Sequence, residues 1–210
     1  MNDKFEGPLE LEDNNLTDLA VLAISEVLRK PKHSNITKLD LSENPAFTHK
    51  AGEYIGQALL DNEGNSKLEK LEFKGVSLGD RGLLRIIDAA NKTPTLEKLN
   101  VGVLTDNGLM LLSQRLTGNN YLSELEFSET SDHQQYWTGE AMRMFCDLLK
   151  SSTILKKVKA KFQDCNKKSD AAEDFEDEID FYTDQKKTQI KKERGFEERM
   201  RSCDQESMFQ

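Results

Sequence analysis

The 210 residues have room for one domain of ordinary size and an additional segment, and a content of 36% hydrophobic and 32% charged residues indicates a folded part joined to a polar part. The formal net charge of −9 at pH 7 disfavours a general binder of nucleic acids or of acidic membranes. The N-terminus has no secretory signal and no run approaches the roughly 18 apolar residues of a membrane-spanning helix, so we expect a soluble cytoplasmic protein.

A short pattern, apolar-x-x-apolar-x-apolar, recurs along the chain at intervals of 26 to 33 residues. An incomplete earlier copy contains Leu9 and Leu11. Each copy predicts a strand of about three residues, in which alternate side chains point to opposite faces. The complete copies are Ile36-Leu39-Leu41, Leu68-Leu71-Phe73, Leu96-Leu99-Val101, Leu122-Leu125-Phe127 and Leu155-Val158-Ala160.

A turn and then a helical pattern follow each of the first five strands. Apolar residues spaced three and four apart predict one apolar stripe per helix, as in Ala51, Tyr54, Ile55, Ala58 and Leu59. The last of these helices begins after Thr138 and contains Cys146, for which we expect a buried thiol. One short strand and one helix cannot bury their apolar faces alone, so the copies must stack around a shared core.

These repeats resemble the ribonuclease-inhibitor-like subfamily of leucine-rich-repeat proteins. The resemblance covers roughly residues 5–162 and rests on segments such as ITKLDLSENPAFTHKAGEYIGQALLDN and LEKLEFKGVSLGDRGLLRIIDAANKTPT. It implies an α/β solenoid of five to six repeats over residues 1–162, a horseshoe with a short parallel sheet on its concave side and helices on its convex side. An asparagine is expected after each strand; Asn14 and Asn44 match it, whereas later copies have Val76, Leu104 and Thr130.

Two kinds of protein within this subfamily are similar in architecture. Five or six copies followed by a charged C-terminal helix look like the actin-end-capping domain of tropomodulin-like proteins. Activators of the small GTPase Ran share the repeat type but have more copies, and they imply an ordered asparagine or arginine at the rim, for which Asn44 and Arg81 are candidates. The resemblance implies binding of a protein of unknown identity by an adaptor, scaffold or regulatory subunit, with a regulator of a GTPase or of actin filament ends as the alternative.

The residues that alternate with the inward leucines line the concave face of the predicted sheet. Their mixed charges are suited to orienting a charged partner, and they are equally suited to keeping the sheet soluble. No large aromatic anchor accompanies them. The candidate partner-binding residues on this face are Lys38, Asp40, Lys70, Glu72, Lys74, Lys98, Asn100, Glu124, Glu126, Lys157 and Lys159.

The longest predicted turn, residues 128–138 (SETSDHQQYWT), holds the only tryptophan of the chain. An exposed pair of Tyr136 and Trp137 is typical of a contact anchor. Alternatively, Trp137 packs back onto the rim or onto the last helix. The sequence leaves both interpretations open.

The composition changes after Phe162, and we expect a separate charged tail over residues 163–210, with 14 acidic and 9 basic side chains. Phe175, Ile179 and Tyr182 recur at helical spacing and predict an acidic amphipathic helix. Three interpretations remain: the tail caps the solenoid and offers acids to Lys157, Lys159 and Lys161, it is a recognition helix for a partner's groove, or it is disordered.

The sequence carries no sign of catalysis. It has no phosphate loop, nucleophile elbow or pair of histidines at helical spacing, and its three cysteines indicate neither a disulfide framework nor a zinc site. Glu124 and Glu126 lie on one side of a strand about 7 Å apart, but an open sheet lacks the desolvation that tunes a catalytic acid. We expect no enzyme activity, cofactor or metal. Membership of a larger assembly stays open.

Overall fold

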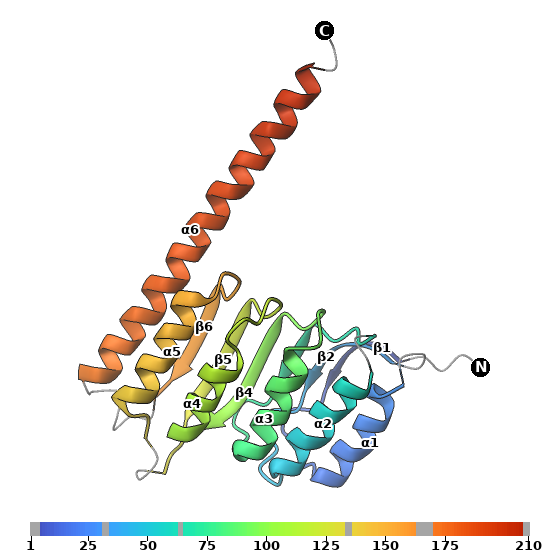
Figure 1. Ribbon diagram of the computed structural model, residues 1–210. Coiled ribbons are helices and arrows are strands. Elements are labelled where there is room, and N and C mark those ends of the chain that lie inside the picture. Colours follow the sequence, from blue (N-terminus) through green and yellow to red (C-terminus); the bar gives the residue numbers. More distant parts are fainter. Residues whose placement is uncertain (1–4, 31–33, 63–64, 133–135, 163–169, 208–210) are drawn as a thin grey trace.

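The computed structural model describes residues 5–30, 34–62, 65–132, 136–162 and 170–207. Within these ranges six strands alternate with six helices (Figure 1). The strands are β1 (Phe5–Glu10), β2 (Ser34–Asp40), β3 (Lys70–Glu72), β4 (Lys98–Leu104), β5 (Glu124–Glu129) and β6 (Lys157–Lys161). The helices are α1 (Asp18–Leu28), α2 (His49–Asp61), α3 (Gly79–Ala90), α4 (Asp106–Arg115), α5 (Gly139–Ser151) and α6 (Asp170–Ser207).

The six strands form one parallel sheet in sequence order, from β1 to β6. Helices α1 to α5 cover one face of this sheet side by side, which leaves the other face to the concave side of the molecule (Figure 1). The predicted leucine-rich-repeat solenoid is therefore confirmed. None of the described helices combines the length and the apolar character that crossing a bilayer requires.

The strand register aligns the inward leucines into rows that run across the sheet. Leu39, Leu71, Leu99, Leu125 and Val158 occupy equivalent positions in β2 to β6, and all five are buried. The first residues of the five predicted copies, from Ile36 to Leu155, are buried as well. Each such side chain stabilises the fold by roughly 1.5–3 kcal/mol relative to an exposed one, so the stacked rows hold the repeats together.

Polar side chains link neighbouring repeats at the starts of α2 and α5. Asp18 of α1 accepts hydrogen bonds from the backbone N–H of Thr48 at 3.0 Å and from its hydroxyl at 2.6 Å, and Thr48 caps α2. The same link recurs where Asp106 accepts from the N–H of Thr138 at 2.7 Å, and Thr138 caps α5. Each carboxylate thereby orders the first turn of the following helix.

Asn44 closes the turn after β2. Its side-chain amide donates to the carbonyls of Leu11, Leu41 and Ser42 at 2.9–3.1 Å. Its side-chain oxygen accepts from the N–H of Leu16 at 2.8 Å, and the residue is fully buried. The asparagine expected after the strand thus joins two successive repeats by bonding to backbone groups of both.

Helix α6 packs against α5 and β6 at the end of the solenoid. Phe175 and Ile179 are buried in this contact and Tyr182 is partly buried, so the amphipathic pattern read from these three residues is confirmed. The centre of this contact is apolar. One interpretation of the tail had it offer acids to Lys157, Lys159 and Lys161; the ion pairs described for Lys157 and Lys159 are instead with Glu124 and Glu126 of β5. Beyond the solenoid, α6 continues as a projecting helix (Figure 1).

Candidate functional site

Two rows of outward-facing residues cross the concave face of the sheet. The strand register places Lys38, Lys70, Lys98, Glu124 and Lys157 in one row. It places Asp40, Glu72, Asn100, Glu126 and Lys159 in the other. Adjacent strands in a sheet lie about 4.8 Å apart, so residues of these rows are within reach of one another across strands. The structure thus brings ten of the predicted site residues together.

Lys38 is the centre of an ion-pair network on β1 to β3. Its amine lies 3.0 Å from Glu10, 3.3 Å from Asp40 and 3.2 Å from Glu72. Burial acts to lower the pKa of Lys38, but the hydrogen bonds to these three carboxylates outweigh it and the pKa is raised. Lys70 adds a further contact to Glu72 at 2.9 Å. On this half of the face, the amines of Lys38 and Lys70 are therefore held in place by ion pairs with carboxylates.

Asp40 is held in its charged form within this network. Burial acts to raise its pKa, but the hydroxyl and the N–H of Ser42 donate to the carboxylate and more than compensate. The bond from the Ser42 N–H measures 3.1 Å. Additional contacts with Glu72 and Lys38 also act to lower the pKa, and the net result lies below the ordinary value.

A second network occupies β4 to β6. Glu124 lies between two lysines, 3.0 Å from Lys98 and 2.8 Å from Lys157. The hydrogen bond from Lys157 is the main cause of a lowered pKa for Glu124, and Lys98 lowers it further against the effect of burial. Lys159 pairs with Glu126 at 2.6 Å. Each strand of this half is thereby tied to its neighbour by charge as well as by backbone hydrogen bonds.

The rows border a groove of about 280 Å³ on the concave face. Asn100 lies in this groove, almost fully buried, and its side-chain oxygen accepts from the N–H of Gly102 at 2.9 Å. Gly102 has a φ of +77°, and a Cβ there would lie 2.1 Å from the carbonyl oxygen of Val76, so only glycine fits. The groove is lined by Lys70, Glu72, Lys98, Leu99, Asn100, Glu124, Glu126, Lys157 and Lys159.

Lys74 lies just after β3, at the rim of the groove rather than within it. Its amine is 3.3 Å from Glu43 and 3.7 Å from Glu12, and these contacts raise its pKa, with the hydrogen bond to Glu43 as the largest cause. All three side chains are about half exposed. Lys74 is therefore available to a partner that approaches from the side of the turns.

The prediction that Trp137 is an exposed contact anchor is wrong. Trp137 is only 3% exposed, and its indole N–H donates to the carbonyl of Leu104 at 3.2 Å. Its ring contacts those of Phe127 and Phe162 edge-to-face, with centroids 5.4 and 5.1 Å apart. A buried indole N–H needs an acceptor that faces it, and the last residue of β4 supplies one. Trp137 is a core residue, as the alternative interpretation held.

The rest of the long turn contributes less than expected. Tyr136 is half-buried, so it is not a fully exposed anchor. His133 lies outside the described residues. At the rim, Asn44 is buried with its side-chain amide committed to three carbonyls, and it cannot reach a partner. Arg81 is 74% exposed and pairs with Glu53 at 3.0 Å.

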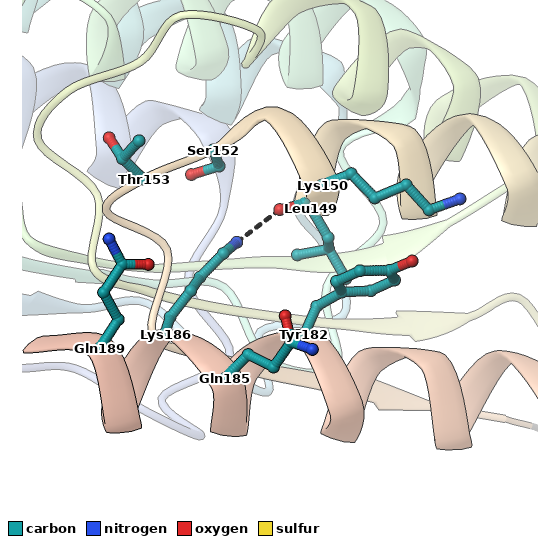
Figure 2. A pocket seen from close by; sticks show the side chains of 8 residues that line it. All are labelled: Leu149, Lys150, Ser152, Thr153, Tyr182, Gln185, Lys186 and Gln189. Atoms are coloured by element: carbon teal, nitrogen blue, oxygen red, sulfur yellow. Dashed lines mark hydrogen bonds between the residues drawn. The ribbon is translucent and has the colours of Figure 1, made fainter.

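A hollow between α5 and α6 was not foreseen from the sequence. Figure 2 shows Lys186 of α6 reaching across it to the carbonyl of Leu149 near the end of α5, at 2.5 Å. Burial lowers the pKa of Lys186. Its spacing of four from Tyr182, on the apolar stripe, was the signal that this lysine faces the solenoid. The hollow measures about 380 Å³ and has Lys150, Ser152, Gln185 and Gln189 among its lining residues.

Comparisons with known proteins agree with the fold. The sequence matches no family model and no curated protein sequence. The structure is similar to a solved structure of leiomodin-1 actin-binding site 2, with a TM-score of 0.64 and 17% sequence identity. The similarity covers 86% of this chain and 95% of that chain. It shows that the two share a solenoid of alternating parallel strands and helices.

Proposed function

We propose that this chain is a non-enzymatic protein-binding module that holds a protein partner on its concave face. The observation that carries this proposal is the pair of charged rows across β2 to β6, with a groove between them. The groove carries both signs of charge, which favours a protein segment of mixed charge over the uniform phosphates of a nucleic acid.

The ion pairs prepare this face for binding. Lys38, Glu124 and Glu126 are held across strands by partners at 2.6–3.2 Å. Side chains that are already ordered lose less conformational entropy when a partner binds. Charges placed in this way mainly set the orientation and the association rate, so the affinity must come from the many contacts along the groove.

Actin is the partner that we propose to test first. The similar structure is that of an actin-binding site of leiomodin-1, and the similarity extends over most of both chains. This favours the tropomodulin-like expectation over the Ran-activator-like one, for which Asn44 is buried and Arg81 is the one rim candidate that is exposed. We accordingly propose a regulator of actin filaments within the ribonuclease-inhibitor-like repeat class.

The test is co-sedimentation of the full chain with filamentous actin. We expect the wild type to co-sediment at micromolar concentration and the double variant Lys98→Glu/Glu126→Lys to bind at least about tenfold more weakly. The matched control, Lys50→Glu/Glu140→Lys, makes the same charge changes at exposed positions of α2 and α5 and should bind like the wild type. Equal binding by both double variants excludes the concave face, and no binding by the wild type excludes actin.

A further inference from the structure

Only the first half of α6 has neighbours among the described elements. The helix contacts α5 and β6, and Lys186 reaches the carbonyl of Leu149 near the end of α5. Figure 1 shows that α6 continues far beyond both of these elements to Ser207. A helix that leaves its domain in this way presents a surface that its own chain does not cover.

One stripe of α6 is divided by charge. Positions spaced alternately three and four residues apart lie along the same side of a helix. The first five positions of the stripe are acidic and the last three are basic, and those from 170 to 187 are exposed. The positions are Asp170, Glu173, Asp177, Asp180, Asp184, Lys187, Lys191 and Arg194.

An exposed aromatic residue accompanies the stripe. Phe181 is 56% exposed, whereas Phe175 and Ile179 of the same helix are buried against the solenoid. Phe181, Asp184 and Thr188 share an open, shallow surface of the helix. An exposed ring flanked by charges is typical of a contact between proteins.

We propose that two copies of this chain associate through an antiparallel pair of α6 helices. In this orientation the acidic half of each helix meets the basic half of the other, whereas a parallel pair would oppose acid to acid. With a two-fold axis between positions 185 and 186, Asp177, Asp180 and Asp184 lie opposite positions 194, 191 and 187. Phe181, one turn after Asp177, lies beside the stripe and flanks the contact between the two helices.

The charged stripe sets the direction and register of this pair, as charged positions do in coiled coils. Exposed ion pairs contribute little to affinity individually and are screened by salt. The apolar contact of Phe181 therefore has to contribute a large share of the free energy of association. Association should be weak, concentration-dependent and sensitive to ionic strength.

Sedimentation velocity of the full chain over a concentration series tests the proposal. We expect a dimer whose dissociation constant rises about tenfold or more between about 0.05 M and about 0.5 M salt. Phe181→Asp should weaken association about tenfold or more, while the control Leu19→Asp, which changes an exposed apolar residue of α1, should leave it unchanged. A full chain that stays monomeric overturns the proposal, as does a dimer that depends on Leu19 but not on Phe181.

Charge reversal distinguishes self-association from the binding of a different helix. One variant carries Asp177→Lys, Asp180→Lys and Asp184→Lys, and the other carries Lys187→Glu, Lys191→Glu and Arg194→Glu. Each variant alone should be monomeric, because the two halves of its stripe, from position 177 to position 194, now carry the same charge. An equimolar mixture should form a heterodimer, because each reversed half meets a half of opposite charge. A mixture that stays monomeric contradicts the antiparallel arrangement.

Discussion

Two buried polar side chains close turns that follow strands of the sheet, one in an early repeat and one in a late repeat. Asn44 joins the first two repeats through its amide. In the late repeat, which has no asparagine after the strand, the indole of Trp137 donates to the carbonyl of Leu104. Asn44 supplies donors to carbonyls of two repeats, whereas the Leu104 carbonyl, which also accepts from the N–H of Thr130, supplies the acceptor that the buried indole needs.

Asn44→Ala should destabilise the protein by about 3 kcal/mol, because it leaves several buried backbone groups without partners. Urea denaturation followed by circular dichroism measures this change in the free energy of unfolding. Asn120→Ala, at an exposed position in a turn, is the control and should change it by less than about 0.5 kcal/mol. If Asn44→Ala lowers the free energy of unfolding no more than Asn120→Ala does, Asn44 does not hold the two repeats together.

Glu124 should make stability depend on pH. Lys157 and Lys98 hold its folded-state pKa below the ordinary value, so the folded protein favours the charged carboxylate more than the unfolded chain does. This stabilisation is complete above the unfolded pKa and is lost as the pH falls through the folded pKa, from about pH 5 downward. The urea midpoint of Glu124→Gln should therefore fall less steeply than that of the wild type between about pH 5 and pH 3. Identical slopes would contradict the ion-pair assignment.

At the scale of elements, α6 is attached to the solenoid by an aromatic cluster. Phe175 contacts the rings of Phe145 and Phe162, each with centroids 5.8 Å apart, and that of Trp137 at 6.2 Å. Repeats of a solenoid contact only their neighbours, so a change in this cluster acts on the end of the molecule before it affects the rest.

Phe175→Ala should detach α6 while the repeats from β1 to α4 stay folded. Loss of a buried ring costs roughly 3–5 kcal/mol of stability. Because α6 is attached to the solenoid through this one cluster, a loss of that size is enough to release the helix. Hydrogen exchange should accelerate over residues 170–186 and stay slow over β2 to β4. Phe181→Ala, on the exposed side of the same helix, is the control. In dilute solution it should leave the hydrogen-exchange rates of both regions unchanged.

Cys146 should report on the same contact. The thiol is buried, and burial raises its pKa, with a further contribution from Glu178 of α6. We expect slow modification of Cys146 by a maleimide in the wild type and a rise of about tenfold or more in Phe175→Ala, measured by mass spectrometry of the Cys146 peptide. Equal rates in the two proteins would mean that α6 does not shield this thiol.

At the scale of the whole molecule, the repeat could be predicted because its physical cause is local. The inward positions, such as Leu39, Leu71 and Leu99, recur in sequence because each strand buries the same face. The outward rows follow from the alternation along a strand, so Lys98 and Glu124 could be placed on one face before the structure was known. Their ion pair across the strands comes from the structure.

The parts that could not be predicted depend on contacts distant in the sequence. Trp137 stands in a polar turn, and only the position of the Leu104 carbonyl, 33 residues earlier, makes it a core residue. The docking of α6 depends on the faces that α5 and β6 leave open, and no local pattern shows these. The pairing of Lys157 with Glu124 rather than with the tail is likewise a competition between partners that spacing alone cannot decide.

Lysine footprinting of the full chain with and without filamentous actin tests most directly whether the concave face binds the partner. Acetylation rates at Lys98, Lys157 and Lys159 should fall when actin is added, because these lysines border the groove. Lys50 and Lys92, which are exposed at the start of α2 and after α3, should keep their rates. Protection of Lys50 and Lys92 with unchanged rates at the groove lysines would contradict the account.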